Sequence, residues 1–351
     1  MNRILGKVFM LAVTAAAVTF LAPRAAECSY APGFIRAADV IPDIVTDIRY
    51  AGENNFAGVR IDGYAAPEAI LTVEAAAALK RAADSLRAQG YRLKIFDAYR
   101  PVKAVEHFVR WGKDPKDAKN KMEYYPNIEK SALFRGGYIS GKSTHSNGST
   151  VDLTIVDSST GEEVDMGSPF DYFGEISHVG TKLITQQQSK NRLILKEAMV
   201  KSGFSAIKTE WWHFKLQNEP YPNKKFNFPV DSPEAADEKT SAALDRISNS
   251  RVITAVPGRT KGRAVIRAYA KSGNVWTLRF TVDGYFGKNG VNSIYYNTDP
   301  IEPGKGSAIF LHRSDGSPTV GSISVSEAAM VFFLGFIDEE TKILISGKGG
   351  F

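Results

Sequence analysis

The sequence predicts an α+β protein of two domains. Segments that alternate like strands are followed by helical segments, but without the strict strand–helix–strand repeat of a parallel α/β fold. A chain of 351 residues is also long for a single domain. Its composition shifts towards strand-forming residues after about residue 247. We therefore expect an α+β domain followed by a smaller, mainly β domain.

The first 27 residues have the features of a secretory signal peptide. Arg3 and Lys7 precede an apolar stretch over residues 8–21, and the small residues Ala25 and Ala26 follow it. We therefore expect an exported protein, located in the periplasm or outside the cell. Because the stretch is short for a membrane span, contact with the membrane is expected only if this segment stays uncleaved.

Residues 28–230 hold the elements expected for the first domain. An alanine-dense helix is predicted over residues 73–89, with Thr72 as its N-cap and a stop at the following glycine. Residues 91–96 alternate as a strand. Pro101 then fits the first turn of a helix that continues to about residue 111.

Further elements are predicted in the rest of this domain. Residues 114–130 are polar and irregular, and residues 151–156 alternate as a strand. A helix is expected over residues 191–202, where Gly203 ends it, and a strand over residues 211–216 closes the unit.

The predicted boundary between the domains lies at residues 231–247, which are polar, acidic and proline-containing. Beyond it, residues 248–351 are rich in Val, Ile, Thr, Tyr and Gly in short alternating runs. We therefore expect a linker followed by a mainly β domain.

Charge and cysteine content exclude several classes of function. The formal net charge of +6 is scattered, without a basic run interleaved with aromatic residues, so no nucleic-acid partner is expected. Cys28 is the only cysteine, so the chain has neither an internal disulfide nor a multi-cysteine metal site.

Two separate motifs supply a set of metal-ligand residues. His145 and Asp152 begin and end the segment His-Ser-Asn-Gly-Ser-Thr-Val-Asp, and His213 closes Glu-Trp-Trp-His. Two imidazoles and one carboxylate leave the fourth position of a tetrahedral zinc open, as in catalytic sites. The sequence therefore predicts one catalytic Zn²⁺ per chain.

Glu210 and Arg100 are the candidates for proton transfer and charge stabilisation. A bound zinc lowers the pKa of its water to roughly 7. Glu210 is expected to take the water's proton and pass it to the leaving amine, and Arg100 to neutralise the developing oxyanion. Since Glu210 and His213 are three residues apart in a predicted strand, a bulge or twist is expected to turn both into one cleft. The pattern indicates a zinc hydrolase.

Another motif overlaps this region. Residues 136–143 read Gly-Gly-Tyr-Ile-Ser-Gly-Lys-Ser and match the phosphate-loop pattern G-x-x-x-x-G-K-[ST]. A phosphate loop requires a buried strand before it and a helix after it, whereas a polar turn and a strand follow here. We therefore interpret the match as accidental. Asn147 fits a glycosylation acceptor, but it lies inside the proposed site and is discounted.

The first domain resembles VanX-type D-alanyl-D-alanine dipeptidases from roughly residue 33 to residue 230. These belong to the zinc D-Ala-D-Ala peptidases, which share a fold with the hedgehog signalling domain. The resemblance rests on Asp-Gly-Tyr at 62–64, Asp-Ala-Tyr-Arg-Pro at 97–101, Tyr-Tyr-Pro-Asn-Ile at 124–128, the segment 145–154, Met-Gly-Ser at 166–168, Phe-Asp at 170–171 and Glu-Trp-Trp-His at 210–213.

The resemblance implies a zinc-dependent dipeptidase that hydrolyses D-Ala-D-Ala. It assigns the same roles to the three zinc ligands, to Glu210 and to Arg100. It further implies that Ser143 binds the substrate carboxylate and that Asp171 binds its free ammonium group. Many relatives are cytoplasmic, whereas an exported form would meet D-Ala-D-Ala or short peptides released from peptidoglycan.

The second domain resembles, over shorter motifs, the catalytic domain of YkuD-type L,D-transpeptidases. The matching segments are residues 284–290, 303–312 and 318–322. Those enzymes use a cysteine nucleophile, but Ser322 stands at its position, and serine is a poor nucleophile in a site built for a thiolate. We expect a degenerate domain that binds peptidoglycan peptides; residual catalysis and a purely structural β domain are the alternatives.

Two alternatives to the dipeptidase are considered. A zinc D,D-carboxypeptidase would act on longer peptides with the same metal, and Asp171 argues against it if this residue anchors a free amine. A non-catalytic peptidoglycan-binding protein would have no use for the base Glu210.

Overall fold

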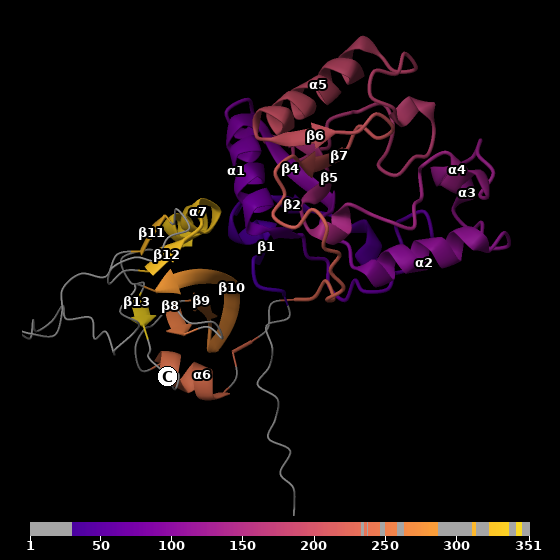
Figure 1. Ribbon diagram of the computed structural model, residues 1–351. Helices are drawn as coiled ribbons and strands as arrows, with labels where there is room; N and C mark the ends of the chain where they lie inside the picture. Colours follow the sequence, from indigo (N-terminus) through magenta and orange to yellow (C-terminus); the bar gives the residue numbers. More distant parts are fainter. Residues whose placement is uncertain are drawn as a thin grey trace, which may run out of the picture.

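A computed structural model confirms the α+β class (Figure 1). It describes residues 30–232, 235–236, 238–245, 250–257, 263–286, 311–313, 323–336 and 342–345. The predicted signal peptide, Cys28 and Ser322 lie outside these residues. Within the described ranges, no helix is both long and apolar enough to cross a membrane.

The first domain is built on a five-stranded sheet. Its strands are, in spatial order, β2 (Val45–Thr46), β4 (Tyr91–Asp97), β5 (Thr150–Asp157), β7 (His213–Leu216) and β6 (Phe204–Ala206). Only the β2–β4 pair is parallel among these strands. A separate antiparallel pair, β1 (Phe34–Arg36) and β3 (Ile70–Thr72), leads into the first helix.

Five α-helices accompany this sheet. They are α1 (Val73–Arg87), α2 (Val102–Lys113), α3 (Lys121–Tyr124), α4 (Ala132–Arg135) and α5 (Gln186–Lys201). Single turns of 3₁₀ helix occur at Ala37–Asp39, Arg49–Ala51, His145–Asn147 and Glu175–Ser177.

Several predicted helix limits agree with the structure and others differ. Thr72 caps α1 by accepting a hydrogen bond from the Ala75 amide at 3.3 Å. Pro101 precedes α2 in an extended conformation instead of lying in its first turn. Helix α5 begins earlier than expected because Thr185 and Gln188 form a capping box. The Thr-x-x-Gln pattern was the overlooked signal.

The described part of the second domain is mainly β, as expected. Its six-stranded sheet has the order β11 (Leu311–Arg313), β12 (Ile323–Val325), β10 (Val275–Phe286), β9 (Arg263–Ser272), β8 (Arg251–Pro257) and β13 (Lys342–Ile345). Helix α7 (Glu327–Phe336) connects β12 to β13 in sequence. The predicted linker contains helix α6 (Glu238–Asp245), whose Asp245 accepts a hydrogen bond from the Trp276 indole at 2.7 Å.

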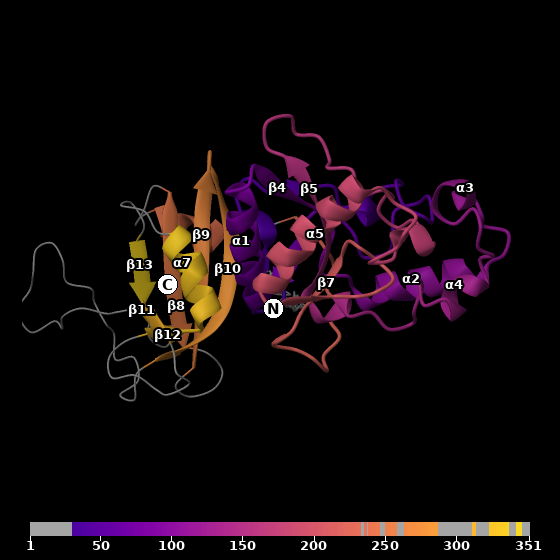
Figure 2. The same cartoon turned by 90° about the horizontal axis from the view of Figure 1, so that it is seen from above.

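Helix α1 lies between the five-stranded sheet and the second domain, as Figures 1 and 2 both show. It packs on β4 and α5 of its own domain and on α7 of the second domain. Nine of its 15 residues are buried, more than one apolar stripe would supply. Its small alanine side chains therefore allow neighbours to approach on several sides.

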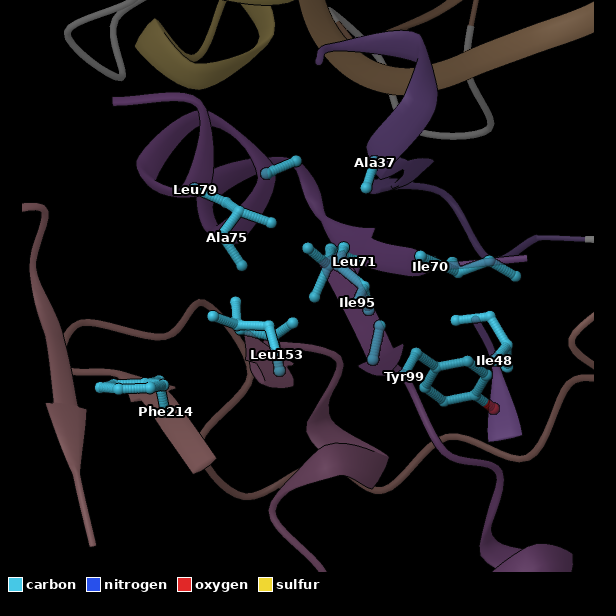
Figure 3. Packing of buried hydrophobic residues seen from close by; sticks show 14 of the residues in the cluster. Ala37, Ile48, Ile70, Leu71, Ala75, Leu79, Ile95, Tyr99, Leu153 and Phe214 are labelled. Carbon is cyan, nitrogen blue, oxygen red and sulfur yellow. The ribbon is translucent and has the colours of Figure 1, made fainter. Parts of the chain in front are cut away.

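The core of the first domain lies between α1 and the sheet (Figure 3). Ala75 and Leu79 of α1 face Leu71, and below them lie Ile95 of β4 and Leu153 of β5. All five side chains are fully buried. This packing holds the strands that carry the polar residues described next.

Candidate metal centre

The register of two strands brings the predicted metal ligands together. Asp152 in β5 lies directly opposite His213, the first residue of β7, so both side chains project from the same face of the sheet. His145 arrives from the 3₁₀ turn just before β5. One ligand atom from each of the three residues lies within 4.8 Å of the others.

Gly148 makes the turn after His145 possible. Its φ of +84° lies in the left-handed region that favours glycine. A β-carbon at this position would lie 2.1 Å from Cε1 of Phe34. The glycine thus lets the metal-ligand segment approach β1 and reverse into β5.

The three side chains fit a tetrahedral cation. His145 Nε2 lies 3.3 Å from His213 Nδ1 and 3.3 Å from Asp152 Oδ2, and His213 Nδ1 lies 3.0 Å from Asp152 Oδ1. Ligands bound at about 2.0–2.2 Å in a tetrahedron are separated by about 3.3–3.5 Å, so both distances from His145 match and the distance between His213 and Asp152 is shorter. Asp152 Oδ1 is buried and accepts no hydrogen bond within the described part of the chain, as expected for an oxygen that binds a metal.

Neighbouring groups decide where the protons lie on His145 and Asp152. His145 Nδ1 lies 2.7 Å from the Ala98 carbonyl oxygen, which only accepts, so Nδ1 carries a proton and Nε2 is the nitrogen that faces the other two side chains. Burial opposes ionisation of Asp152, but the neighbouring His145 and His213 outweigh it and lower the pKa of this carboxyl. Asp152 is therefore ionised, which suits it to bind a cation.

Glu210 lies beside the metal ligands, as predicted, but by a different local structure. Strand β7 begins only at His213, and a turn at residues 211–212, without a bulge, brings Glu210 Oε2 to 3.7 Å from His213 Nδ1. Burial raises the pKa of Glu210 to about 7, and the charge of Asp152 acts in the same direction. A carboxyl group with this pKa is suited to accept and return a proton near neutral pH.

Arg100 lies on the other side of Asp152, held by a residue that sequence reasoning missed. Its Nε donates to Asp97 Oδ2 at 2.9 Å, and Nη2 forms an ion pair with the same oxygen at 2.8 Å. Nη2 donates to Asp152 Oδ2 at 3.4 Å. Asp97 is completely buried, and its other oxygen accepts from the Tyr64 hydroxyl at 2.5 Å. Asp97 and Tyr64 lie within motifs of the family resemblance, which was the available signal.

Asp171 and Ser143 flank this centre. Asp171 has a φ of 59°, is buried, and accepts a hydrogen bond from the Tyr50 hydroxyl at 2.7 Å. Burial raises its pKa well above the ordinary value, outweighing the Tyr50 hydrogen bond, and the charges of Asp152 and Glu210 add to the rise. Ser143 Oγ accepts from the His145 amide at 3.2 Å. Tyr50 had no sequence signal of its own.

Comparisons with known proteins identify the family of the first domain. The model of the Peptidase_M15 family, described as D-Ala-D-Ala dipeptidase, matches residues 30–231. The chain is 43% identical over 198 residues to the D-alanyl-D-alanine dipeptidase of Enterococcus faecalis, covering 56% of this chain and 98% of that protein.

More distant relatives have the same name. The D-alanyl-D-alanine dipeptidase of Streptomyces coelicolor is 38% identical over 192 residues, which cover 55% of this chain and 95% of the relative. The D-alanyl-D-alanine dipeptidase of Escherichia coli is 32% identical over 186 residues, which cover 53% of this chain and 86% of the relative. The resemblance predicted for the first domain is confirmed, and this chain belongs to the M15 family of metallopeptidases, in the group described as D-Ala-D-Ala dipeptidases.

Proposed function

We propose that this protein is a zinc-dependent dipeptidase that hydrolyses D-Ala-D-Ala. The observation that carries the proposal is the cluster of His145, Asp152 and His213 in tetrahedral spacing, with Glu210 in contact with it. The names of the relatives support the substrate. The nitrogen and carboxylate donors of the cluster favour Zn²⁺.

Glu210 is assigned the proton transfers. A zinc ion held by His145, Asp152 and His213 would acidify a water molecule and polarise the peptide carbonyl. Glu210 takes one proton from the attacking water and delivers it to the amide nitrogen as the C–N bond breaks. Its raised pKa of about 7 allows both steps.

Arg100 is assigned the negative charge that develops on the carbonyl oxygen. One hydrogen bond and one ion pair with Asp97 hold the guanidinium, and the rings of Tyr50 and Phe108 lie 5.0 and 5.1 Å from it. A preorganised cation in a buried site stabilises such charge without reorganisation.

Asp171 and Ser143 are assigned the two ends of the substrate. A dipeptide carries an ammonium group and a carboxylate at a fixed separation. An ammonium group that pairs with Asp171 stabilises its ionised form, which burial alone disfavours. The Ser143 hydroxyl serves as a hydrogen-bond donor for the carboxylate. Recognition of both ends restricts the reaction to free dipeptides.

We also propose that the protein is exported and that its second domain is an L,D-transpeptidase-like domain without a cysteine nucleophile. The N-terminal apolar segment and the motifs before Ser322 support these two points. Outside the cytoplasm, peptidoglycan turnover would supply D-Ala-D-Ala.

The test is amine release by zinc-loaded protein from D-Ala-D-Ala and from N-acetyl-D-Ala-D-Ala, with a Glu210→Ala variant beside it. Cleavage of the free dipeptide alone, lost in the variant, is expected. Cleavage of the blocked peptide would instead indicate a D,D-carboxypeptidase. Cleavage of neither by metal-loaded protein would indicate a peptidoglycan-binding protein.

A further inference from the structure

Arg192 on helix α5 is a buried cation bonded mostly to backbone carbonyls. Its Nε donates to Met166 O at 2.6 Å, Nη1 to His178 O at 3.2 Å, and Nη2 to Ile176 O at 2.9 Å and to Ser168 Oγ at 3.3 Å. Arg192 is 8% exposed and forms no ion pair with a carboxylate within the described ranges. One guanidinium therefore joins both ends of the segment 166–178.

The segment 166–178, here named the Asp171 loop, carries the residue assigned to the substrate ammonium. It contains little regular structure apart from one 3₁₀ turn, and Asp171 itself has a positive φ of 59°. A non-glycine residue in that conformation persists only where its surroundings hold it. The bonds from Arg192 hold the loop at its two ends.

The same loop is bonded to the turn that carries Glu210. The Trp211 amide donates to Ser177 O at 3.1 Å, and the Trp211 indole donates to Ser168 Oγ at 3.0 Å. Ser168 also accepts from Arg192, whose guanidinium lies 5.7 Å from the Trp211 ring. The Asp171 loop and the turn that carries Glu210 are thus joined by one backbone hydrogen bond and one hydrogen bond between side chains.

Burial of the Arg192 guanidinium has a cost that its hydrogen bonds offset. Removing a cation from water is unfavourable unless close partners replace the lost hydration. Burial lowers the pKa of Arg192 to about 10, which reflects this cost. The planar fork of arginine can bond several acceptors at once, whereas a lysine ammonium cannot span them.

We propose that Arg192 is a positioning residue that fixes the Asp171 loop and thereby sets the place of Asp171 relative to the metal ligands. The first part of this proposal, that Arg192 holds the Asp171 loop in place, depends only on the hydrogen bonds described above. The effect on substrate binding rests on the proposed function. Arg192 itself touches no reacting group.

Hydrogen exchange tests the loop-fixing part without any activity. Arg192→Lys is expected to speed exchange of backbone amides in residues 166–178 and to leave β4 and β5 protected. Arg81→Lys is the matched control, because Arg81 also bonds to carbonyls, those of Ala77 and Ser202, but not to the loop. Unchanged exchange in the loop, or a rise throughout the first domain, would overturn the proposal.

Kinetics test the effect on substrate binding. Arg192→Lys is expected to raise KM for D-Ala-D-Ala roughly tenfold, because a displaced Asp171 would lose its charged hydrogen bond to the substrate ammonium. The change in kcat should be smaller, and the zinc content should stay unchanged. If Arg192 acts through Asp171, its substitution should add little to KM once Asp171→Asn is present. Fully additive effects on KM would contradict the positioning role.

Failure of the proposed function would look different. Zinc-loaded wild-type protein would then leave D-Ala-D-Ala intact, while the exchange measurement would still decide whether Arg192 orders the loop. If the enzyme is active and Arg192→Lys speeds exchange in the loop but leaves KM unchanged, only the positioning role of Arg192 is wrong.

Discussion

At the scale of single residues, the chemistry depends on carboxyl groups whose surroundings push their pKa values apart. Asp152 stays ionised beside two imidazoles, whereas burial raises the pKa of Glu210 to about 7. Such a difference between neighbouring carboxyl groups separates a ligand from a base. Both assignments lead to measurable consequences.

Glu210→Gln is expected to lower kcat by about 10²- to 10⁴-fold, the usual contribution of a general base, because the amide cannot accept the proton. Zinc content should stay at one per chain, since the three ligands are untouched. Glu197→Gln is the matched control, because Glu197 is an exposed residue of α5 that pairs with Lys201. Retained activity in Glu210→Gln would remove Glu210 from the mechanism.

The pH dependence of kcat/KM follows from the same residue. A base must be deprotonated, so activity is present above its pKa and is lost as the pH falls through it. The pKa of Glu210 is about 7 without a cation, and a bound divalent cation favours the carboxylate and lowers it. The acidic limb of the profile is therefore expected below pH 7. A limb centred above pH 8 would argue against Glu210 as the base.

At the scale of elements, the metal centre depends on a tight turn and on strand register. Pairing of β5 with β7 sets Asp152 opposite His213, and a one-residue slip would send one of them to the other face. The turn at Gly148 then places His145 beside these two residues. Backbone geometry at this turn is therefore as important as the ligands themselves.

Gly148→Ala is expected to destabilise the protein by about 3 kcal/mol or more, from left-handed strain and from overpacking against Phe34. Gly137→Ala is the matched control: its φ is +77°, but no atom lies within 4 Å of an added β-carbon, so only about 1–2 kcal/mol of strain is expected. Denaturant unfolding compares the two variants. Equal losses would show that the contact with Phe34 is easily relieved.

At the scale of the whole molecule, the second domain packs against the first at two places: α7 contacts helix α1, and β10 contacts strand β1. Phe280, Phe332 and Phe333 of the second domain belong to the same buried cluster as the residues of α1. Asp39 bonds to both Arg36 and Arg279, and the Gly33 amide donates to Thr281 O at 3.1 Å. The second domain is therefore packed against the first and is not merely tethered to it.

Removal of all residues after 232 is expected to lower the thermal midpoint of the first domain by several degrees and to cause binding of a hydrophobic dye. The physical reason is exposure of the apolar surface of α1 and β1, which costs about 25 cal/mol per Å². Scanning calorimetry and dye fluorescence measure both effects. An unchanged midpoint would mean that the shared core contributes little to the first domain.

The sequence by itself predicted the metal-ligand types, the candidate base Glu210, the position of Arg100 beside them, the α+β class and the cap of α1 at Thr72. These depend on residue identity or on spacing within one element, so local patterns specify them. Helix α5 starts before the expected residue 191 because the capping box of Thr185 and Gln188, which is also a local pattern, begins it at Gln186.

Only the tertiary structure decided how distant segments meet. In the folded chain Asp152 pairs with His213 across two strands, and Asp97 accepts hydrogen bonds from Arg100 and Tyr64. Arg192 donates hydrogen bonds to both ends of the Asp171 loop. The physical reason is that register and burial are decided by the packing of the whole core. A buried polar group must find partners wherever the folded chain places them.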